Sequence, residues 1–308
     1  MAPTSPDGSS ISPTTRSPSS PPSGSAPSTS GSPGSGLTRR TLVDLARRHG
    51  LRPRKSLGQH FLADPNLARA IAREAGAGPG ERFLEVGAGL GSLTVALTAA
   101  GAEVLAVETD RRLAEALEEV VAGLPVRVVV ADATAADWPG LLGPEPWRMA
   151  SNLPYHAAVP ILLDLLERAT EVGPFVVMVQ REVGERLAAG PGEPAFGAVS
   201  LKVAYRADVR VLRRVPPTVF WPAPGVESVL LRLDRRPPPV AAPPDRLFAL
   251  IEEGFRERRK TMTTALVRLG LDRDRARAML SSCGIDPRAR AETLGLHEFN
   301  RLADALDG

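Results

Sequence analysis

The sequence predicts an α/β fold built on an open, mainly parallel sheet, followed by a small helical domain. From Phe83 onward, short β-branched runs alternate with amphipathic helical patterns, and beyond residue 245 only helical periodicity remains. With 308 residues, of which 43% are hydrophobic, the chain can bury a sizeable core. A ligand of such a sheet is expected beyond the carboxyl ends of its central strands.

The chain divides into segments of different composition. Residues 1–36 are almost wholly Ser, Pro, Gly, Thr and Ala, which predicts a disordered tail. Residues 37–236 hold the α/β pattern and begin with a basic arm at 39–55, where seven Arg or Lys residues face one acidic residue. The proline-rich run at 235–244 reads as a linker. Residues 245–308 are the predicted helical domain.

The individual elements follow in chain order. Asp64 before Pro65 predicts an N-cap with proline in the first turn, opening a helix that ends near Ala75. The predicted strands cover residues 83–86, 103–108, 126–130, 148–153 and 174–180, with 208–215 and 228–235 as an antiparallel pair. Between these strands, one predicted helix starts at Gly91, and four others cover residues 110–121, 156–169, 181–189 and 196–206.

Charge, cysteine content and hydropathy exclude several classes of protein. A formal charge of +3 is too small for a uniformly basic nucleic-acid binder, so such a partner must be held by local Arg and Lys clusters. The single cysteine, Cys283, can form no internal disulfide and has no metal-ligand companions. No apolar run is long enough for a bilayer span or a signal peptide. We therefore expect a cytoplasmic protein with neither a metal nor a membrane partner.

Strand ends offer groups for a nucleoside cofactor. The first strand runs into a turn, Glu85 to Gly91, whose glycines (Gly87 and Gly89 among them) let a ligand approach the backbone. Because Ser92 interrupts the G-x-G-x-x-G spacing, a dinucleotide is disfavoured. Glu108 ends the second strand, where it can accept ribose hydroxyls, and Asp132 ends the third, where it can accept an adenine amino group. This layout fits S-adenosylmethionine, whose positive charge favours nearby carboxylates. Helix capping is the alternative role for an acidic residue here, and for Asp110 both roles stay open.

The end of the fourth strand carries Asn152-Leu153-Pro154-Tyr155. The lone pair of a nucleobase amino nitrogen is delocalised, so this nitrogen becomes nucleophilic only when acceptors bind its N–H groups. The Asn152 oxygen and a carbonyl of the Leu153-Pro154 turn can supply two acceptors, and Tyr155 can stack on the base. In isolation the same tetrapeptide is also compatible with an ordinary turn. Its position beside the cofactor groups predicts methyl transfer to an adenine amine.

With these residues in place, the chain resembles the ribosomal RNA adenine N6,N6-dimethyltransferase family from about Arg54 to near the C-terminus. The resemblance rests on Leu57-Gly58-Gln59-His60-Phe61-Leu62, the Glu85 to Gly91 turn, Val107-Glu108, Asp132-Ala133, Asn152 to Tyr155, Phe220-Trp221-Pro222-Ala223-Pro224, Val226-Glu227-Ser228 and Arg258-Arg259-Lys260-Thr261. It implies a Rossmann-like class I methyltransferase sheet at 37–236. It also implies dimethylation of two adjacent adenosines in the 3′-terminal hairpin loop of 16S rRNA, on immature small subunits. We expect the protein to act as a monomer.

The resemblance also assigns roles to residues. Cofactor contacts are implied for His60, Leu62, Gly87, Gly89, Glu108, Asp132, Ala133 and Asn152. Phe220 would sandwich the target adenine opposite Tyr155, and a core aromatic after the sixth strand is the alternative role for this residue. The family usually has Asn at the position of His60, and an Arg or Asn pair is common at Thr263-Thr264.

A second basic cluster precedes Thr261. Arg256, Arg258, Arg259 and Lys260 lie within about one helical turn, so together with the basic arm they can neutralise RNA phosphates. A solvated helix face is the alternative. If the cluster binds phosphates, the domain at 245–308 contacts RNA.

Three other functions remain as alternatives. An enzyme of the same fold could methylate 23S rRNA and give macrolide resistance, but Asn152-Leu153 and the Arg-Arg-Lys-Thr block disfavour it. A non-catalytic RNA-binding assembly factor would not need Glu108, Asp132, Asn152 and Tyr155 intact. A DNA adenine methyltransferase would normally carry Asp-Pro-Pro-Tyr and a larger second domain.

Overall fold

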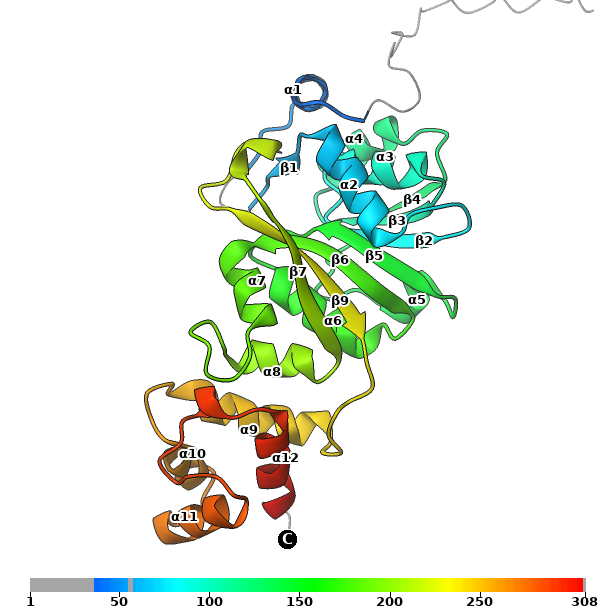
Figure 1. The fold of residues 1–308 in the computed structure, drawn as a ribbon. Coiled ribbons are helices and arrows are strands. Elements are labelled where there is room, and N and C mark those ends of the chain that lie inside the picture. Colours follow the sequence, from blue (N-terminus) through cyan, green and yellow to red (C-terminus); the bar gives the residue numbers. More distant parts are fainter. Residues whose placement is uncertain (1–35, 55–57, 307–308) are drawn as a thin grey trace, which may run out of the picture. The chain divides into compact units, whose positions relative to one another are not determined.

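Figure 1 shows the fold in a computed structural model, which describes residues 36–54 and 58–306. The predicted disordered tail lies outside the described residues except for Gly36. Lys55 of the basic arm and Leu57 of the first motif also lie outside them. The elements below carry the labels of Figure 1.

A seven-stranded sheet forms the centre of the α/β part, in the order β4-β3-β2-β5-β6-β9-β7. The strands from β4 to β6 are parallel, and β9 runs antiparallel to both of its neighbours, β6 and β7. Their bounds are β2 (Arg82–Val86), β3 (Glu103–Glu108), β4 (Val126–Val130), β5 (Trp147–Asn152), β6 (Val172–Gln180), β7 (Ala207–Val215) and β9 (Ser228–Arg235). All seven predicted strands and the antiparallel pair are confirmed.

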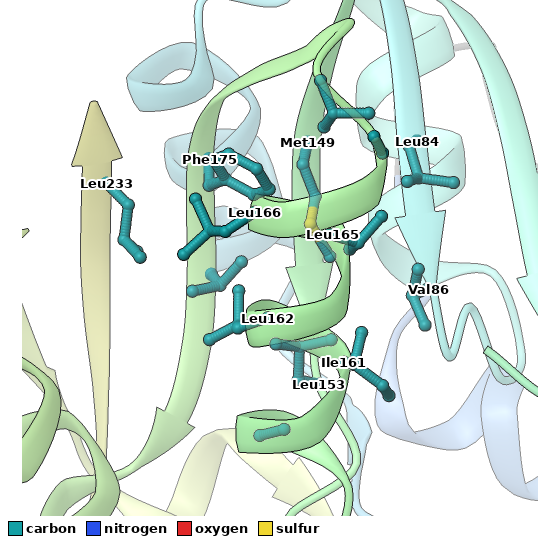
Figure 2. Packing of buried hydrophobic residues seen from close by; sticks show 14 of the residues in the cluster. Leu84, Val86, Met149, Leu153, Ile161, Leu162, Leu165, Leu166, Phe175 and Leu233 are labelled. Atoms are coloured by element: carbon teal, nitrogen blue, oxygen red, sulfur yellow. The ribbon is translucent and has the colours of Figure 1, made fainter. Parts of the chain in front are cut away.

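Helices cover both faces of the sheet, because neighbouring residues of the central strands point to opposite sides. On one face, Leu84 and Met149 pack with the leucines of α6, as Figure 2 shows. On the other face, Phe83 packs against α2 and α3. The first face carries α5 (Trp138–Leu142), α6 (Ala158–Arg168), α7 (Arg181–Ala188) and α8 (Ala198–Ala204), and the second carries α2 (Pro65–Ala75), α3 (Ser92–Ala99) and α4 (Arg111–Val120). The predicted helices are confirmed, and α5 was not predicted.

Helix α2 begins as its sequence predicts. The Asp64 side chain accepts hydrogen bonds from the amides of Asn66 (2.8 Å) and Leu67 (3.2 Å), and proline occupies the first turn. The helix ends at Gly76, whose φ of 79° is left-handed. These caps satisfy amides and carbonyls that a helix leaves unpaired at its ends.

The basic arm contains a helix that its charge alone did not predict. Helix α1 (Arg39–Arg48) is capped by the Thr38 side chain and buries Leu42 and Leu45. Their partners include Leu113 and Ala116 of α4. Beyond α1, the two-residue strands β1 (Phe61–Leu62) and β8 (Phe220–Trp221) pair antiparallel and form a separate small sheet.

The C-terminal part is helical, as predicted. It contains α9 (Pro244–Arg256), α10 (Met262–Arg268), α11 (Arg273–Ser282), the 3-10 turn η3 (Ala291–Thr293) and α12 (Leu296–Ala305). Their core shares one cluster with Phe196 and Leu201, and the Tyr205 hydroxyl donates to the Ala242 carbonyl (3.1 Å). Another 3-10 turn, η2 (Pro217–Val219), lies in the α/β part, directly before β8. The domain boundaries at 236 and 245 stay a prediction.

Within residues 36–54 and 58–306, no helix combines the length and the apolar character needed to cross a bilayer. The same ranges contain no group of three His, Cys, Asp or Glu side chains arranged to hold a metal ion.

Candidate active site

A cavity of about 770 Å³ opens at the carboxyl ends of β2 and β5. The strand order reverses between these two strands, because β3 and β4 lie on one side and β6 on the other. The backbone pairing of β2 with β5 ends at Leu84 and Met149. Toward the carboxyl ends of the two strands, the Ser151 hydroxyl accepts a hydrogen bond from the Val86 amide (2.9 Å). The cavity therefore lies where open α/β sheets bind ligands.

Most predicted site residues meet in this cavity. Its lining includes His60, Leu62, Gly87, Gly89, Glu108, Asp132, Ala133, Asn152, Leu153, Pro154 and Tyr155. These come from segments up to about a hundred residues apart, which the parallel strands bring to one edge. Phe220 and the basic cluster at 256–260 are not part of its lining.

The glycine turn lies directly against the Asn-Pro turn. Gly87 has a φ of +73°, and a Cβ there would lie 3.1 Å from the Pro154 Cδ atom. Gly89 has a φ of +57°, and its Cβ would meet the Phe61 ring at 2.9 Å. Glycine is therefore required at both positions by conformation and by space.

Glu108 is buried and held in one orientation. Its Oε2 accepts from the Gly89 amide (2.9 Å), and its Oε1 accepts from the amides of Thr109 (2.9 Å) and Asp110 (3.1 Å). Burial raises the pKa of this carboxyl, while the three backbone bonds act in the opposite direction. Asp110, whose role was left open, caps α4 through the Arg112 amide (3.0 Å).

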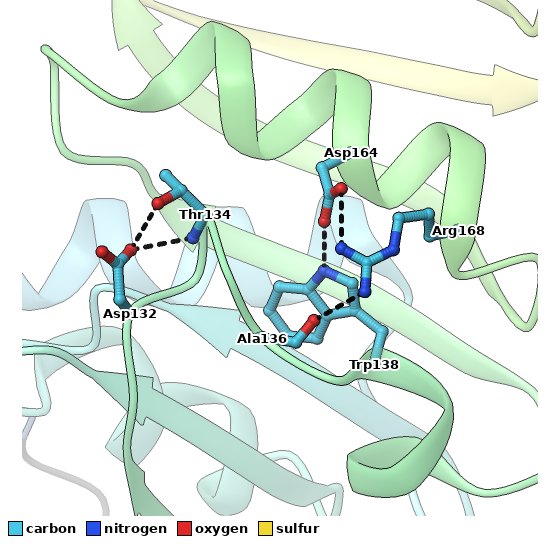
Figure 3. Close-up of polar contacts among 6 residues, drawn as sticks. All are labelled: Asp132, Thr134, Ala136, Trp138, Asp164 and Arg168. Atoms are coloured by element: carbon cyan, nitrogen blue, oxygen red, sulfur yellow. Dashed lines mark hydrogen bonds and ion pairs between the residues drawn. The ribbon is translucent and has the colours of Figure 1, made fainter.

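Asp132 lies at the exposed rim of the cavity. One carboxylate oxygen, Oδ1, accepts from the amide (2.9 Å) and the hydroxyl (2.7 Å) of Thr134, as Figure 3 shows. These bonds lower the pKa of Asp132, so it stays ionised.

A buried tryptophan anchors the loop that follows Asp132. The Trp138 indole donates to Asp164 (2.8 Å) on α6, and Arg168 donates to the Ala136 carbonyl (3.1 Å) (Figure 3). Arg168 also pairs with Asp164 (3.1 Å). The loop is thus tied to α6 at Ala136 and at Trp138.

Asn152 is oriented by a bond on one side of its amide. Its Nδ2 donates to the His60 carbonyl (2.9 Å), while its Oδ1 is buried without a hydrogen-bond donor among the described residues. In the following turn, the Pro154 carbonyl accepts from the Ala157 amide (3.0 Å). The Leu153 carbonyl has no such donor in the described ranges. Two acceptors therefore remain open at neighbouring positions.

Tyr155 is half-buried and tied to the strand that follows β8 in sequence. Its hydroxyl bonds the Ser228 hydroxyl (2.7 Å) at the start of β9, and burial raises the pKa of the phenol. The His60 ring lies against it, with ring centroids 5.3 Å apart and the planes tilted by 32°. Tyr155 thus presents a fixed ring at the cavity.

Phe220 lies outside the lining of the cavity. The ring is 1% exposed and belongs to the core cluster on the α2 face. The cause is the β1–β8 pair, in which Phe220 lies opposite Leu62 and packs with it in that core. Trp221, the next residue, packs against Phe61 instead (6.1 Å between centroids). In this structure no second aromatic ring from β8 faces Tyr155 across the cavity.

The basic cluster does not share one helix face. Helix α9 ends at Arg256, and the other three cations lie in the turn before α10. Arg256 pairs with Glu253 (3.1 Å) and Arg258 with Glu292 (2.9 Å). Arg259 and Lys260 are exposed, and neither has an acidic partner within the described part of the chain. Thr263 is one of the two residues at which the chain departs from the Arg or Asn pair common in the family. It is buried, and its hydroxyl donates to the Pro287 carbonyl (2.7 Å).

Sequence reasoning gave no role to Glu85. This residue lines the cavity, is 2% exposed and accepts a hydrogen bond from the Thr94 hydroxyl (2.6 Å). Burial raises its pKa to about 8, and Glu108 adds to the rise. The position of Glu85 near the carboxyl end of the first predicted strand was the feature of the sequence that could have indicated a place at the cavity. The Ser92 hydroxyl, also at the cavity, is buried without a partner among residues the structure describes.

The residues present fit S-adenosylmethionine. Glu108 and Asp132 bring two carboxyl groups to one cavity, which suits a cationic ligand with ribose hydroxyls and an adenine amine. The glycine turn lines the same cavity, and the Ser92 hydroxyl, which has no partner among the described residues, offers a further polar contact.

Comparison with solved structures shows the same architecture. The 23S rRNA methyltransferase ErmE is 26% identical, with a TM-score of 0.61 over 80% of this chain and 100% of that one. A dimethyladenosine transferase from Plasmodium falciparum is 21% identical, with a TM-score of 0.65 over 79% of this chain and 96% of that one. The α/β fold is that of class I S-adenosylmethionine-dependent methyltransferases, as predicted.

Comparison with sequences identifies the family. The chain is 46% identical over 275 residues to a protein of Thermobifida fusca named ribosomal RNA small subunit methyltransferase A, covering 87% of this chain and 95% of that protein. A protein of the same name from Moorella thermoacetica is 43% identical over 279 residues, covering 87% and 96%. The model of the family described as ribosomal RNA adenine dimethylase matches residues 50–307. The chain therefore belongs to the ribosomal RNA adenine dimethylase family.

Proposed function

We propose that the protein transfers methyl groups from S-adenosylmethionine to N6 of two adjacent adenosines in the 3′-terminal hairpin loop of 16S rRNA. The observation that carries this proposal is the buried Oδ1 of Asn152, which has no hydrogen-bond donor among the described residues and lies beside the residues proposed to bind the cofactor. The family assignment gives the class of enzyme, an S-adenosylmethionine-dependent rRNA adenine methyltransferase. The name of the relatives supports the small subunit as the target.

The described side chains can activate an amine without a strong base. Asn152 Oδ1 and the Leu153 carbonyl accept the two N–H groups of the adenine amine, which favours a pyramidal nitrogen with an available lone pair. Because the Asn152 Nδ2 donates to the His60 carbonyl, the oxygen of the amide is the atom left to accept from the adenine amine. When bound, S-adenosylmethionine supplies an electrophilic methyl group on a sulfonium. Alignment of donor and acceptor then provides most of the rate.

Tyr155 provides the surface for the base. A ring tied by its hydroxyl to Ser228 loses little entropy on stacking, and stacking on an aromatic ring contributes about 1 to 3 kcal/mol per base. Because the methylated nitrogen is strongly acidic, its proton can leave to water.

The comparisons favour the small-subunit target over the macrolide-resistance alternative. The relatives named for the small subunit are 46% and 43% identical, against 26% for the 23S rRNA methyltransferase ErmE. A non-catalytic assembly role is disfavoured because the groups predicted to bind the cofactor and the acceptor share one cavity.

The proposal includes the remaining expectations about partners. The protein would act as a monomer in the cytoplasm on immature small subunits. Arg259 and Lys260 are the exposed cations of the basic cluster without acidic partners among residues 36–54 and 58–306, so they are the first candidates for phosphate contact. The cofactor roles proposed for Leu62, Gly87, Gly89 and Ala133 rest on their place in the cavity wall.

Mass spectrometry of 16S rRNA tests the proposal. Cells that lack this protein should lose two neighbouring N6,N6-dimethyladenosines, and wild-type protein should restore both. If both dimethyladenosines persist in the deletion strain, or if the missing modification lies in 23S rRNA, the proposal is wrong.

A further inference from the structure

His60 connects groups that act on the methyl acceptor. Its carbonyl accepts from the Asn152 amide (2.9 Å), its ring lies 5.3 Å from that of Tyr155, and its Nδ1 bonds the Pro222 carbonyl (2.7 Å). Because a carbonyl oxygen can only accept, Nδ1 carries the hydrogen in this bond. One residue therefore contacts both parts of the acceptor site and the loop that follows β8.

The backbone around His60 explains this position. Phe61 and Leu62 pair with Trp221 and Phe220, so His60 enters the cavity from a segment already fixed by the β1–β8 ladder. The bond from the His60 side chain to the Pro222 carbonyl extends the contact between the β1 and β8 segments by one further residue. On the other side, Gly58 has a φ of +65°, and a Cβ there would lie 3.4 Å from the Tyr155 Cβ atom. The ring of His60 is held in place by its own hydrogen bond and by close packing.

Two ties hold the Tyr155 ring. Its hydroxyl is bonded to Ser228 at one end, and the imidazole of His60 packs near its face. Pro222 directly follows β8 and Ser228 is the first residue of β9, so the two ties lead to the two ends of one connecting segment. With Phe220 buried in the core, His60 is the aromatic ring that contacts Tyr155 in this structure.

We propose that His60 is a positioning residue for the methyl acceptor, holding Tyr155 in its stacking orientation through the Nδ1–H bond to the Pro222 carbonyl. This inference rests on the proposed function and assigns the side chain of His60 to the acceptor rather than to the cofactor. The bond is the essential part, because without it the imidazole has no fixed orientation from which to support Tyr155.

Three substitutions separate the bond from the ring. His60→Asn places an amide N–H near the position of Nδ1 and is the residue usual in the family, so it keeps the donor and loses the ring. His60→Phe keeps a ring and loses the donor. His60→Ala loses both. His297→Phe, at an exposed position on α12, is the matched control for the same exchange.

A spectroscopic readout follows Tyr155 without any RNA. The chain has two tyrosines, so protein labelled with 3-fluorotyrosine gives two fluorine resonances, and Tyr155→Phe assigns them. We expect His60→Phe, His60→Asn and His60→Ala all to shift or broaden the Tyr155 resonance, because each variant loses the imidazole ring, its hydrogen bond or both, and His297→Phe to leave the resonance close to the wild-type position. An unchanged Tyr155 resonance in both His60→Phe and His60→Ala would overturn the inference.

Kinetics and cofactor titration complete the test. We expect kcat to fall about tenfold or more in all three variants, because none of them keeps both the imidazole ring and its hydrogen bond to the Pro222 carbonyl. The Kd for S-adenosylmethionine, measured by calorimetry, should stay within about twofold of wild type in all three variants. A loss of cofactor affinity with unchanged kcat would instead show a cofactor contact and refute the positioning role. If wild-type protein methylates no 16S rRNA but Tyr155 still responds as expected, the proposed function fails while the positioning of Tyr155 stands.

Discussion

The chemistry of the site depends on how single polar groups are satisfied. Asn152 donates from its nitrogen and keeps a buried oxygen open, and Glu108 is fixed by three backbone amides. A buried acceptor without a donor costs free energy in the folded protein, so its retention indicates a function at that atom. The free energy is recovered when an amine donates to it.

Glu85 gives the site a pH dependence that is measurable in the purified protein. Its pKa of about 8 in the folded state lies above the ordinary value of 4.5. Between these pH values the folded protein retains a proton that the unfolded chain has released, so the free energy of unfolding falls as pH rises. We expect Glu85→Gln to raise the melting temperature relative to wild type at about pH 8, with little difference near pH 4. Calorimetric scans across this range provide the measurement.

The control for this prediction is Glu103→Gln, because Glu103 is exposed at the start of β3. This variant should follow the wild-type melting curve at both pH values. A Glu85→Gln variant that gains no stability between about pH 4 and pH 8 would contradict a protonated Glu85.

Residues at strand ends were the most predictable part of the site. Glu108, Asp132 and Asn152 were placed correctly at the cavity because parallel strands deliver their carboxyl ends to one edge. The burial of Phe220 outside the cavity could not be read from the sequence, because the direction of its side chain depends on a two-residue strand pair that no periodicity reveals. The role of Glu85 was missed because burial, which raises its pKa, is a property of the packed structure.

At the level of elements, α1 is the clearest difference between sequence and structure. Its charges suggested only a basic arm, yet Leu42 and Leu45 at a helical spacing bury themselves against α4. Arg48 and His49 add bonds to Glu119 of that helix (2.6 and 2.7 Å). The Thr38 cap and the leucine spacing are present in the sequence. The segment was interpreted only as a basic arm, because its high content of Arg and Lys was given more weight than these helix signals.

Removing the Leu45 side chain tests the docking of α1. This residue is 1% exposed, and a leucine-to-alanine change at such a position costs about 2 to 5 kcal/mol. We expect amide hydrogen exchange in residues 39–48 to accelerate at least tenfold, because a stability loss of this size permits an increase in exchange rate of at least that factor. The exchange rates in β2 should not change. Mass spectrometry of exchanged peptides measures it.

Arg40→Ala is the matched control on the same helix, since the Arg40 side chain is 94% exposed. Its exchange rates should stay near those of wild type. Equal rates in Leu45→Ala and Arg40→Ala would show that α1 is not held by its apolar face.

For the whole molecule, the order of strands decides where chemistry takes place. The reversal between β2 and β5 opens the cavity, and the alternation of strands and helices along the chain was enough to predict an edge of this kind. Segments distant in sequence complete it, because β1 brings His60 to Asn152 and β9 brings Ser228 to Tyr155. Those contacts depend on long-range pairing and could not be predicted from local patterns.

The most direct measurement compares methyl transfer and cofactor binding in Asn152→Ala. Loss of one pre-oriented group that acts on the reacting atoms costs about 10² to 10³ in kcat. We therefore expect single-turnover methylation of 16S rRNA to fall by at least about 10²-fold while the Kd for S-adenosylmethionine changes by less than about threefold. Glu108→Ala is the contrasting variant, in which the Kd should rise. Unchanged turnover in Asn152→Ala, or a loss explained wholly by weaker cofactor binding, would contradict the role of its open oxygen as the acceptor for the adenine amine.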